Sequence, residues 1–133
     1  MRLVERLGLT DTVKVFGYLP HHECVRFLLS SDVLWVIVGD AVASPGKTYE
    51  YIGVGKPILG LVPDGFLKTT ILEAGGKVVP PKDVNGIKDA LLDIYEKFSR
   101  GTLHGPEPHV VHKYNRRSLT GSLVKVFESL VES

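Results

Sequence analysis

The sequence predicts an α/β fold in which helices flank a parallel sheet. Short apolar runs alternate with segments whose apolar residues recur at helical spacing, which is typical of parallel sheets. The run VLWVIV at residues 33–38 is apolar on both faces, as a strand covered by helices on both sides must be. The length of 133 residues fits one domain. We therefore expect a single domain over residues 1–133 with about four strands.

Four short apolar runs carry the predicted strands. They lie near Val13, Val33, Pro57 and Val78, in the stretches VKVFG, DVLWVIV, KPILGLV and GGKVVPP. Each run is rich in branched apolar residues and is followed by glycine, proline or aspartate, which form turns. Because a helical segment separates each run from the next, we expect parallel strands joined by crossover connections.

Amphipathic segments in the first half of the chain predict three helices. The first covers the opening residues and ends at Gly8, and the second begins at Pro20. The third spans about residues 45–54 and ends at Gly55, because glycine favours the left-handed conformation that follows many helices. These segments fill the spaces between the predicted strands.

The second half of the chain predicts three further helices. A short one covers about residues 67–74, and Asp83 caps a longer one. The apolar face of the longer helix consists of Ile87, Ala90, Leu91, Ile94, Tyr95 and Phe98. A loop rich in glycine and proline follows at residues 100–109. The last helix spans about 118–131 and carries one apolar face, with Leu119, Leu123, Val126, Phe127 and Leu130.

Composition and charge exclude several classes of function. Sixteen basic residues balance 15 acidic ones, so no basic surplus predicts binding to nucleic acid. Cys24 is the sole cysteine, which excludes a disulfide within the chain and fits a reducing compartment. The longest apolar run is far shorter than the ~20 residues that span a bilayer. We expect a cytoplasmic protein without a nucleic-acid partner, a transmembrane segment or a metal site.

The segment after the most apolar run predicts an anion site. In the stretch ASPGKTYEY, Ser44 suits the cap of a helix and Pro45 suits its first position. Gly46 leaves the free backbone N–H groups uncovered, and Lys47 adds a positive charge. A helix that begins in this way can bind a phosphate. The alternative is a simple capped helix whose Lys47 pairs with Glu50.

This segment is not a P-loop, although it contains the letters GKT. A P-loop requires a glycine five residues before Gly46, and Ala41 stands there. The surrounding residues also lack the glycine-rich run of that motif. We therefore do not expect an ATPase of that type.

Three stretches resemble the C-terminal domain of GT-B-type glycosyltransferases of the group 1-like family. They are SPGKTYEYIGVGKPILG, the earlier VKVFGYLP and the later ILEAGGKVVPPKDV. The resemblance runs along nearly the whole chain, and its first stretch is the most specific. It implies a Rossmann-like domain that binds a nucleoside diphosphate sugar as donor substrate, with no cofactor. It also implies that the domain is truncated, since the family has about six strands.

The resemblance assigns roles to individual residues. It implies that Glu50 accepts hydrogen bonds from the ribose hydroxyls, while backbone amides at residues 44–47 meet the diphosphate. The turn formed by Gly17, Tyr18 and Leu19 is implied to lie beside the base. The resemblance assigns no catalytic residue.

One position departs from the family pattern. Many members carry a second glutamate eight residues before the one aligned with Glu50, and Val42 stands there in this chain. That glutamate contacts the donor sugar in the family, so the sequence lacks one expected sugar contact. Two alternatives to a transferase fragment therefore stay open: a non-catalytic nucleotide-binding or interaction module, and a fragment of a GT-B sugar-nucleotide epimerase.

The implied truncation has consequences for partners. The acceptor-binding domain is expected on a missing N-terminal part or on a partner chain, so we expect the isolated chain to be inactive. The whole enzyme could meet the membrane surface through that part. Missing strands would leave the strand at residues 33–38 with an open edge. We expect either a rearranged four-stranded sheet, with residues 13–17 beside that strand, or a homodimer.

Overall fold

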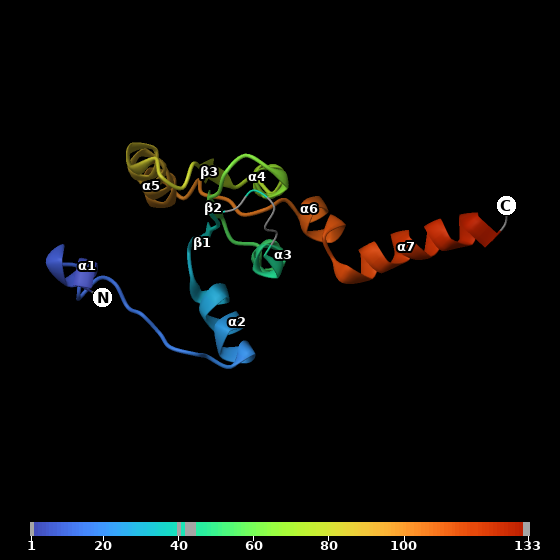
Figure 1. Ribbon diagram of the computed structural model, residues 1–133, viewed down its shortest axis with the longest axis horizontal. Helices are drawn as coiled ribbons and strands as arrows, with labels where there is room; N and C mark the ends of the chain where they lie inside the picture. The colour runs from blue at the N-terminus through green and yellow to red at the C-terminus, as the bar shows by residue number, and fades with distance from the viewer. Residues whose placement is uncertain (1, 40, 42–44, 132–133) are drawn as a thin grey trace.

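The computed structural model describes residues 2–39, 41 and 45–131, and it confirms the α/β class. Its sheet is parallel and contains β1 (Leu34–Ile37), β2 (Ile58–Leu61) and β3 (Lys77–Val79) in the order β1-β2-β3. Leu34 pairs with Ile58, and Leu61 pairs with Val79. All four residues of β2 are buried because this strand lies in the middle and helices cover both of its faces (Figure 1).

The predicted strand at residues 13–17 does not form. This segment has no ladder partner, and Val15 and Phe16 are 69% and 53% exposed. The ring of Phe16 instead packs against Phe27 at 4.8 Å between centroids. A strand needs an edge to pair with, and the contact with Phe27 holds the segment elsewhere. The expectation of four strands and the rearranged sheet are therefore wrong, and β1 is an edge strand of the described sheet.

The predicted helices form close to their expected positions. They are α1 (Arg2–Arg6), α2 (His21–Ser30), α3 (Gly46–Val54), α4 (Phe66–Glu73), α5 (Val84–Ser99), α6 (Pro108–Lys113) and α7 (Arg116–Val131). Only α6 was not predicted, since it begins at a proline inside the segment expected to be a loop. Proline suits the first turn of a helix because its missing N–H has no intrahelical partner there.

Local sequence signals determine where α3 ends and where α5 begins. Gly55 adopts a left-handed conformation with φ of 78° and ends α3 as predicted. Asp83 caps α5, where its Oδ1 accepts a hydrogen bond from the Gly86 N–H at 2.9 Å. Such a cap satisfies one of the free N–H groups that every helix N-terminus leaves.

The core lies on both faces of the sheet. On one face, Val36 and Ile58 pack with residues of α3, α4 and α6, including Ile52, Ile71 and Val110. On the other face, the core consists of Leu59, Leu61 and Val79 with Ala90 and Ile94 of α5. Neighbouring residues of β2 thus contribute to different layers, as the alternation of side chains along a strand requires.

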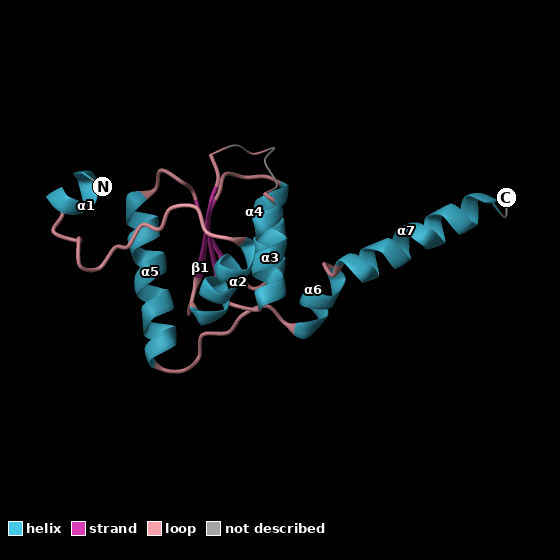
Figure 2. Cartoon of the chain, turned by 90° about the horizontal axis from the view of Figure 1, so that it is seen from below, coloured by secondary structure: helices cyan, strands magenta, loops and turns pink. Residues whose placement is uncertain are grey.

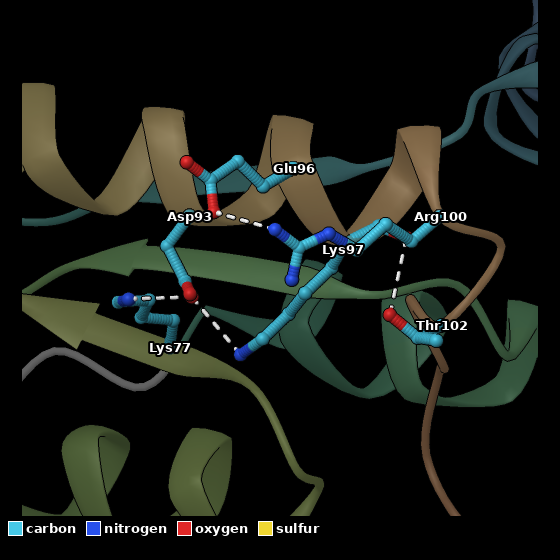
Figure 3. A network of polar contacts seen from close by, with 6 residues as sticks. All are labelled: Lys77, Asp93, Glu96, Lys97, Arg100 and Thr102. Carbon is cyan, nitrogen blue, oxygen red and sulfur yellow. Dashed lines mark hydrogen bonds and ion pairs between the residues drawn. The ribbon is translucent and has the colours of Figure 1, made fainter.

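A polar network fastens α5 to the end strand β3. Asp93 of α5 accepts hydrogen bonds from Lys77 at 2.7 Å and from Lys97 at 3.0 Å (Figure 3). These two ammonium groups hold the pKa of Asp93 below its ordinary value. Because the groups are partly exposed, the network orients the helix more than it stabilises the fold.

The two terminal helices stand apart from these layers. Neither α1 nor α7 buries a residue, and α7 extends away from the body of the molecule (Figures 1 and 2). In the described part of the chain, every helix falls short of the length and hydrophobicity that crossing a bilayer requires.

Candidate functional site

The carboxyl ends of the three parallel strands meet at one edge of the sheet. Ligands of such sheets bind beyond this edge. A cavity of about 450 Å³ opens here. Its lining consists of Gly39, Val62, Pro63, Asp64, Lys68, Val78, Pro80, Pro81 and Lys82. The lining residues that follow β1, β2 and β3 show that all three strand ends contribute to it.

The cavity carries two lysines and one carboxylate. Lys68 donates a hydrogen bond to Oδ1 of Asp64 at 2.6 Å, and this bond is the main cause that lowers the pKa of Asp64. Lys82 forms no ion pair within the described residues. The lining therefore has a surplus of positive charge, which suits an anionic ligand.

Sequence reasoning missed Lys68 and Lys82 as site residues. It treated Asp64 as a turn former and did not consider either lysine. The signal that could have found them is their position, because each follows a predicted strand within a few residues. In a parallel sheet that position leads to the carboxyl edge.

A close backbone approach joins this cavity to the segment before α3. A Cβ atom at Gly65 would lie 2.7 Å from the carbonyl oxygen of Ala41, and Gly65 has a φ of 156°. The turn after β2 and the chain after β1 therefore touch. Asp64, the neighbour of Gly65, lines the cavity, so the contact brings Ala41 close to that lining.

The start of α3 lies one residue later than predicted. Pro45 occupies the cap position and Gly46 is the first helical residue, whereas Ser44 was the expected cap. Ser44 and Val42 lie outside the described residues. Pro45 makes no side-chain cap, and the first N–H groups of a helix have no partner within it. The amides of Gly46 and Lys47 are thus the donors that a ligand could use.

Glu50 lies one turn into α3 and is exposed. The buried face of this helix holds Thr48 and Ile52, and Glu50 is on another side. No ion pair joins Lys47 to Glu50 among residues that the structure describes, so the alternative pairing is not observed. Both charges are free to contact a ligand.

A buried hydroxyl lies beside these groups without a partner. Thr48 is 0% exposed, and its Oγ1 is the only buried side-chain oxygen or nitrogen in the described chain that lacks a hydrogen bond. Such an orphaned group typically costs about 1–3 kcal/mol. It sits at the third position of α3, next to the open amides.

The predicted base-binding turn stays apart from these residues. Gly17, Tyr18 and Leu19 precede α2 in an extended segment, and Tyr18 is 96% exposed. The Sγ of Cys24 contacts the carbonyl oxygen of Leu19 at 3.7 Å. Within the described residues, no side-chain hydrogen bond or ion pair links the turn to the start of α3. Its role therefore stays a prediction.

A further contact near the site joins α2 to α3. Burial raises the pKa of Tyr51 in α3, and the nearby Glu50 and Cys24 raise it further. Cys24 belongs to α2, which packs against α3. Among the residues with a described position, no three histidine, cysteine or carboxylate side chains could hold a metal ion.

The sequence is similar to bacterial glycosyltransferases. No family model matches it. It is 24% identical over 139 residues to WcaL of Salmonella typhimurium, which is provisionally named as a colanic acid biosynthesis glycosyltransferase. The match covers 96% of this chain and 34% of WcaL. WcaL of Escherichia coli K12, which carries the same name, is 24% identical over 138 residues with equal coverage.

The fold is similar to that of a solved enzyme. Sucrose-phosphate synthase from Thermosynechococcus elongatus matches 98% of this chain with a TM-score of 0.71 and 20% identity. The match covers 33% of that enzyme, and at this identity it establishes the fold alone. The chain spans about a third of the length of each relative. These findings confirm the predicted resemblance to part of a GT-B-type glycosyltransferase.

Proposed function

We propose that this chain is the donor-binding part of a glycosyltransferase and that it holds a nucleoside diphosphate sugar at the start of α3. The observation that carries the proposal is the set of polar groups at the start of α3 that have no partner among the described residues. The open amides of Gly46 and Lys47 and the carboxylate of Glu50 lie within one turn of one helix. The relatives named as glycosyltransferases support this reading.

The diphosphate is the part of the donor that the start of α3 suits. A helix N-terminus carries a partial positive charge and presents N–H groups to an anion. Lys47 adds a full charge, and the cavity at the carboxyl edge of the sheet contributes Lys68 and Lys82. When the sugar departs, negative charge grows on the diphosphate, and fixed donors of this kind would stabilise it.

Glu50 is the group that suits the ribose. A carboxylate only accepts hydrogen bonds at neutral pH, and two neighbouring hydroxyls can donate to it together. Among the described residues Glu50 forms no ion pair, so ribose binding would break none there. We also propose that the base contacts the turn formed by Gly17, Tyr18 and Leu19. This contact requires a movement of α2 that brings the turn closer to α3.

A second candidate is nucleotide binding without transfer. Val42 stands where the resembling family carries a second glutamate, and the chain spans a third of its relatives. The acceptor site, any homodimer and the cytoplasmic location are likewise proposals. The two candidates differ in one measurable outcome, because only a transferase, once joined to an acceptor domain, would release nucleoside diphosphate.

Ligand-detected NMR with UDP-, GDP- and ADP-sugars tests the proposal. We expect saturation transfer to the ribose and base protons of one nucleotide class. Lys47→Ala should reduce the transfer, and added salt should weaken it further because the contact is ionic. Lys56→Ala is the matched control, since it removes a lysine at the opposite end of α3. Equal effects of the two variants, or no transfer with any nucleotide, would refute the site.

A further inference from the structure

The ring of Tyr114 links the helix that carries the proposed nucleotide site to a distant part of the sequence. Tyr114 is the residue at which α6 ends, and its ring packs against that of Tyr49 in α3. The two ring centroids are 5.6 Å apart and the planes meet at 45°, a separation at which aromatic rings attract each other. Tyr49 stands between Lys47 and Glu50 in the chain. A contact made at the end of α6 therefore reaches the part of α3 that bears the site.

Polar contacts with α4 hold Tyr114 in place. Its hydroxyl donates a hydrogen bond to Oε2 of Glu73 at 2.6 Å, and Lys113 donates one to Oε1 of the same carboxylate. Hydrogen bonds to an ionised carboxylate are stronger than those between neutral groups. The ammonium group of Lys113 also lies over the Tyr114 ring, 5.3 Å from its centre. The ring thus has a restricted orientation relative to α4.

Two contacts on different sides determine the orientation of α3. Its buried side holds Ile52, which belongs to the core, and another side carries Tyr49 against Tyr114. A helix of nine residues is too short to be stable alone, so its position depends on packing. Burial of one side holds the helix against the sheet. The second contact restricts rotation about the helix axis, and that rotation sets the positions of Lys47 and Glu50.

The groups of the proposed site would all move together if α3 turned. The amides of Gly46 and Lys47 and the carboxylate of Glu50 belong to the first five residues of this helix. Groups that contact a ligand need to be held to within about 0.5 Å and 10–20° by residues that support them. A lateral contact on the same short segment therefore supports all of them at once.

A purely structural role of Tyr114 is the alternative. In that case the tyrosine would only attach α6 to the fold, and its loss would lower stability without changing the affinity for a ligand. The bond to Glu73 and its neighbour Lys113 already attach α6 to α4. The ring contact with Tyr49 is a separate feature, because it joins α6 to α3. Figure 1 shows α6 next to both of these helices.

We propose that Tyr114 is a positioning residue for nucleotide binding, which acts through Tyr49 on the start of α3. The inference rests on the proposed function, because it requires that this helix binds a nucleoside diphosphate. Tyr114 itself contacts no part of the nucleotide in this arrangement. Coupling of this kind is reciprocal, so a bound nucleotide should also strengthen the packing of α6 on α3.

Calorimetric titration of the full chain with UDP, GDP and ADP tests the inference. For the nucleotide that binds, Tyr114→Ala should weaken the Kd by roughly threefold to tenfold, the range that a ring pair contributes. Tyr114→Phe keeps the ring and loses only the hydroxyl, so its Kd should stay within about twofold of the native value. Ile94→Val is the control for lost stability, because it thins the core on the other face of the sheet. Its Kd should equal the native one.

A double-mutant cycle tests whether Tyr114 acts through Tyr49. Tyr49→Ala should weaken the Kd as much as Tyr114→Ala does, and the double variant should be no weaker than either. Hydrogen exchange adds a second measurement: nucleotide should raise the protection of the α6 amides in the native chain and not in Tyr49→Ala. Circular dichroism checks folding, and Tyr114→Leu replaces Tyr114→Ala if the latter unfolds.

The outcomes separate this inference from the proposed function. A native Kd in Tyr114→Ala, additive losses in the double variant, or an equal loss in Ile94→Val would each overturn the inference and leave the nucleotide site intact. A native chain that binds none of the three nucleotides would overturn the proposed function, and the inference with it.

Discussion

The carbonyl oxygen of Ala41 lies so close to the backbone of residue 65 that a side chain there would clash with it. Glycine at position 65 makes the contact feasible. A Cβ atom on Gly65 would approach that oxygen to 2.7 Å. The contact joins the chain after β1 to the turn after β2, and Asp64 of that turn lines the cavity that holds Lys68 and Lys82. Two loops far apart in sequence thereby form one edge of the candidate site.

Replacing Gly65 by alanine should destabilise the protein and disturb this edge. The methyl group would meet the backbone of Ala41, and a φ of 156° strains any other residue. We expect a loss of about 1–3 kcal/mol in the free energy of unfolding. Urea denaturation measures it. Gly53→Ala is the control, because it has nothing within 4 Å and should gain up to about 1 kcal/mol from helix propensity.

Replacing Glu50 by alanine should weaken nucleotide binding without affecting the fold. A hydrogen bond to a charged acceptor contributes about 1.5–3 kcal/mol, so we expect a roughly tenfold to hundredfold weaker Kd. The melting temperature should stay nearly constant, since the exposed carboxylate forms no ion pair within the described chain. Titration calorimetry and thermal melting distinguish the roles. A loss of stability with unchanged binding would instead show that Glu50 has a structural role.

The contact between α4 and α6 should weaken at low pH. Glu73 accepts hydrogen bonds from Lys113 and from the Tyr114 hydroxyl, the latter at 2.6 Å, and these bonds lower its pKa. A lowered pKa means that the carboxylate stabilises the fold above its ordinary pKa. That contribution is lost as the pH falls through the lowered value. The protection of the α6 amides, measured relative to their intrinsic exchange rate at each pH, should therefore fall in acid.

The same cluster should also weaken at high pH. The hydrogen bond with Glu73 raises the pKa of Lys113, and burial followed by that carboxylate raises the pKa of Tyr114. Their contribution is complete below the ordinary pKa values and is lost as the pH rises through the raised ones. Glu73→Gln should reduce the pH dependence of the protection of the α6 amides at both the acidic and the basic end of the range. If the variant lost amide protection in acid to the same extent as the native protein, this assignment would be contradicted.

Replacing Asp83 by alanine should destabilise α5 at its start. The substitution removes the acceptor of the Gly86 N–H and should cost about 1 kcal/mol. Chemical denaturation measures the loss. Asp89→Ala, an exposed acidic residue of the same helix, is the control and should change stability by less than about 0.5 kcal/mol. An equal loss in both variants would show that helix charge, and not the cap, is responsible.

The site could be predicted from the sequence only where one segment holds the signal. The start of α3 was found because proline, glycine and lysine follow a buried strand, although the helix begins one residue later than expected. Lys68 and Lys82 were missed because no local motif marks them and their only signal is their position after a strand. Their importance depends on the sheet, which brings three strand ends together.

Local patterns in the sequence determined the helices other than α6, the parallel strands β1, β2 and β3, the glycine that ends α3 and the cap at Asp83. These features depend on residues close to one another along the chain, so periodicity and turn chemistry suffice. The tertiary structure alone decided that residues 13–17 form no strand, because a strand exists only where an edge accepts it. It also decided the contact of Gly65 with Ala41 and the exposure of the apolar side chains on α7 and on α5, such as Leu91 and Phe98. An apolar helix face in the sequence predicts that something covers it, whereas only packing shows whether its own chain does.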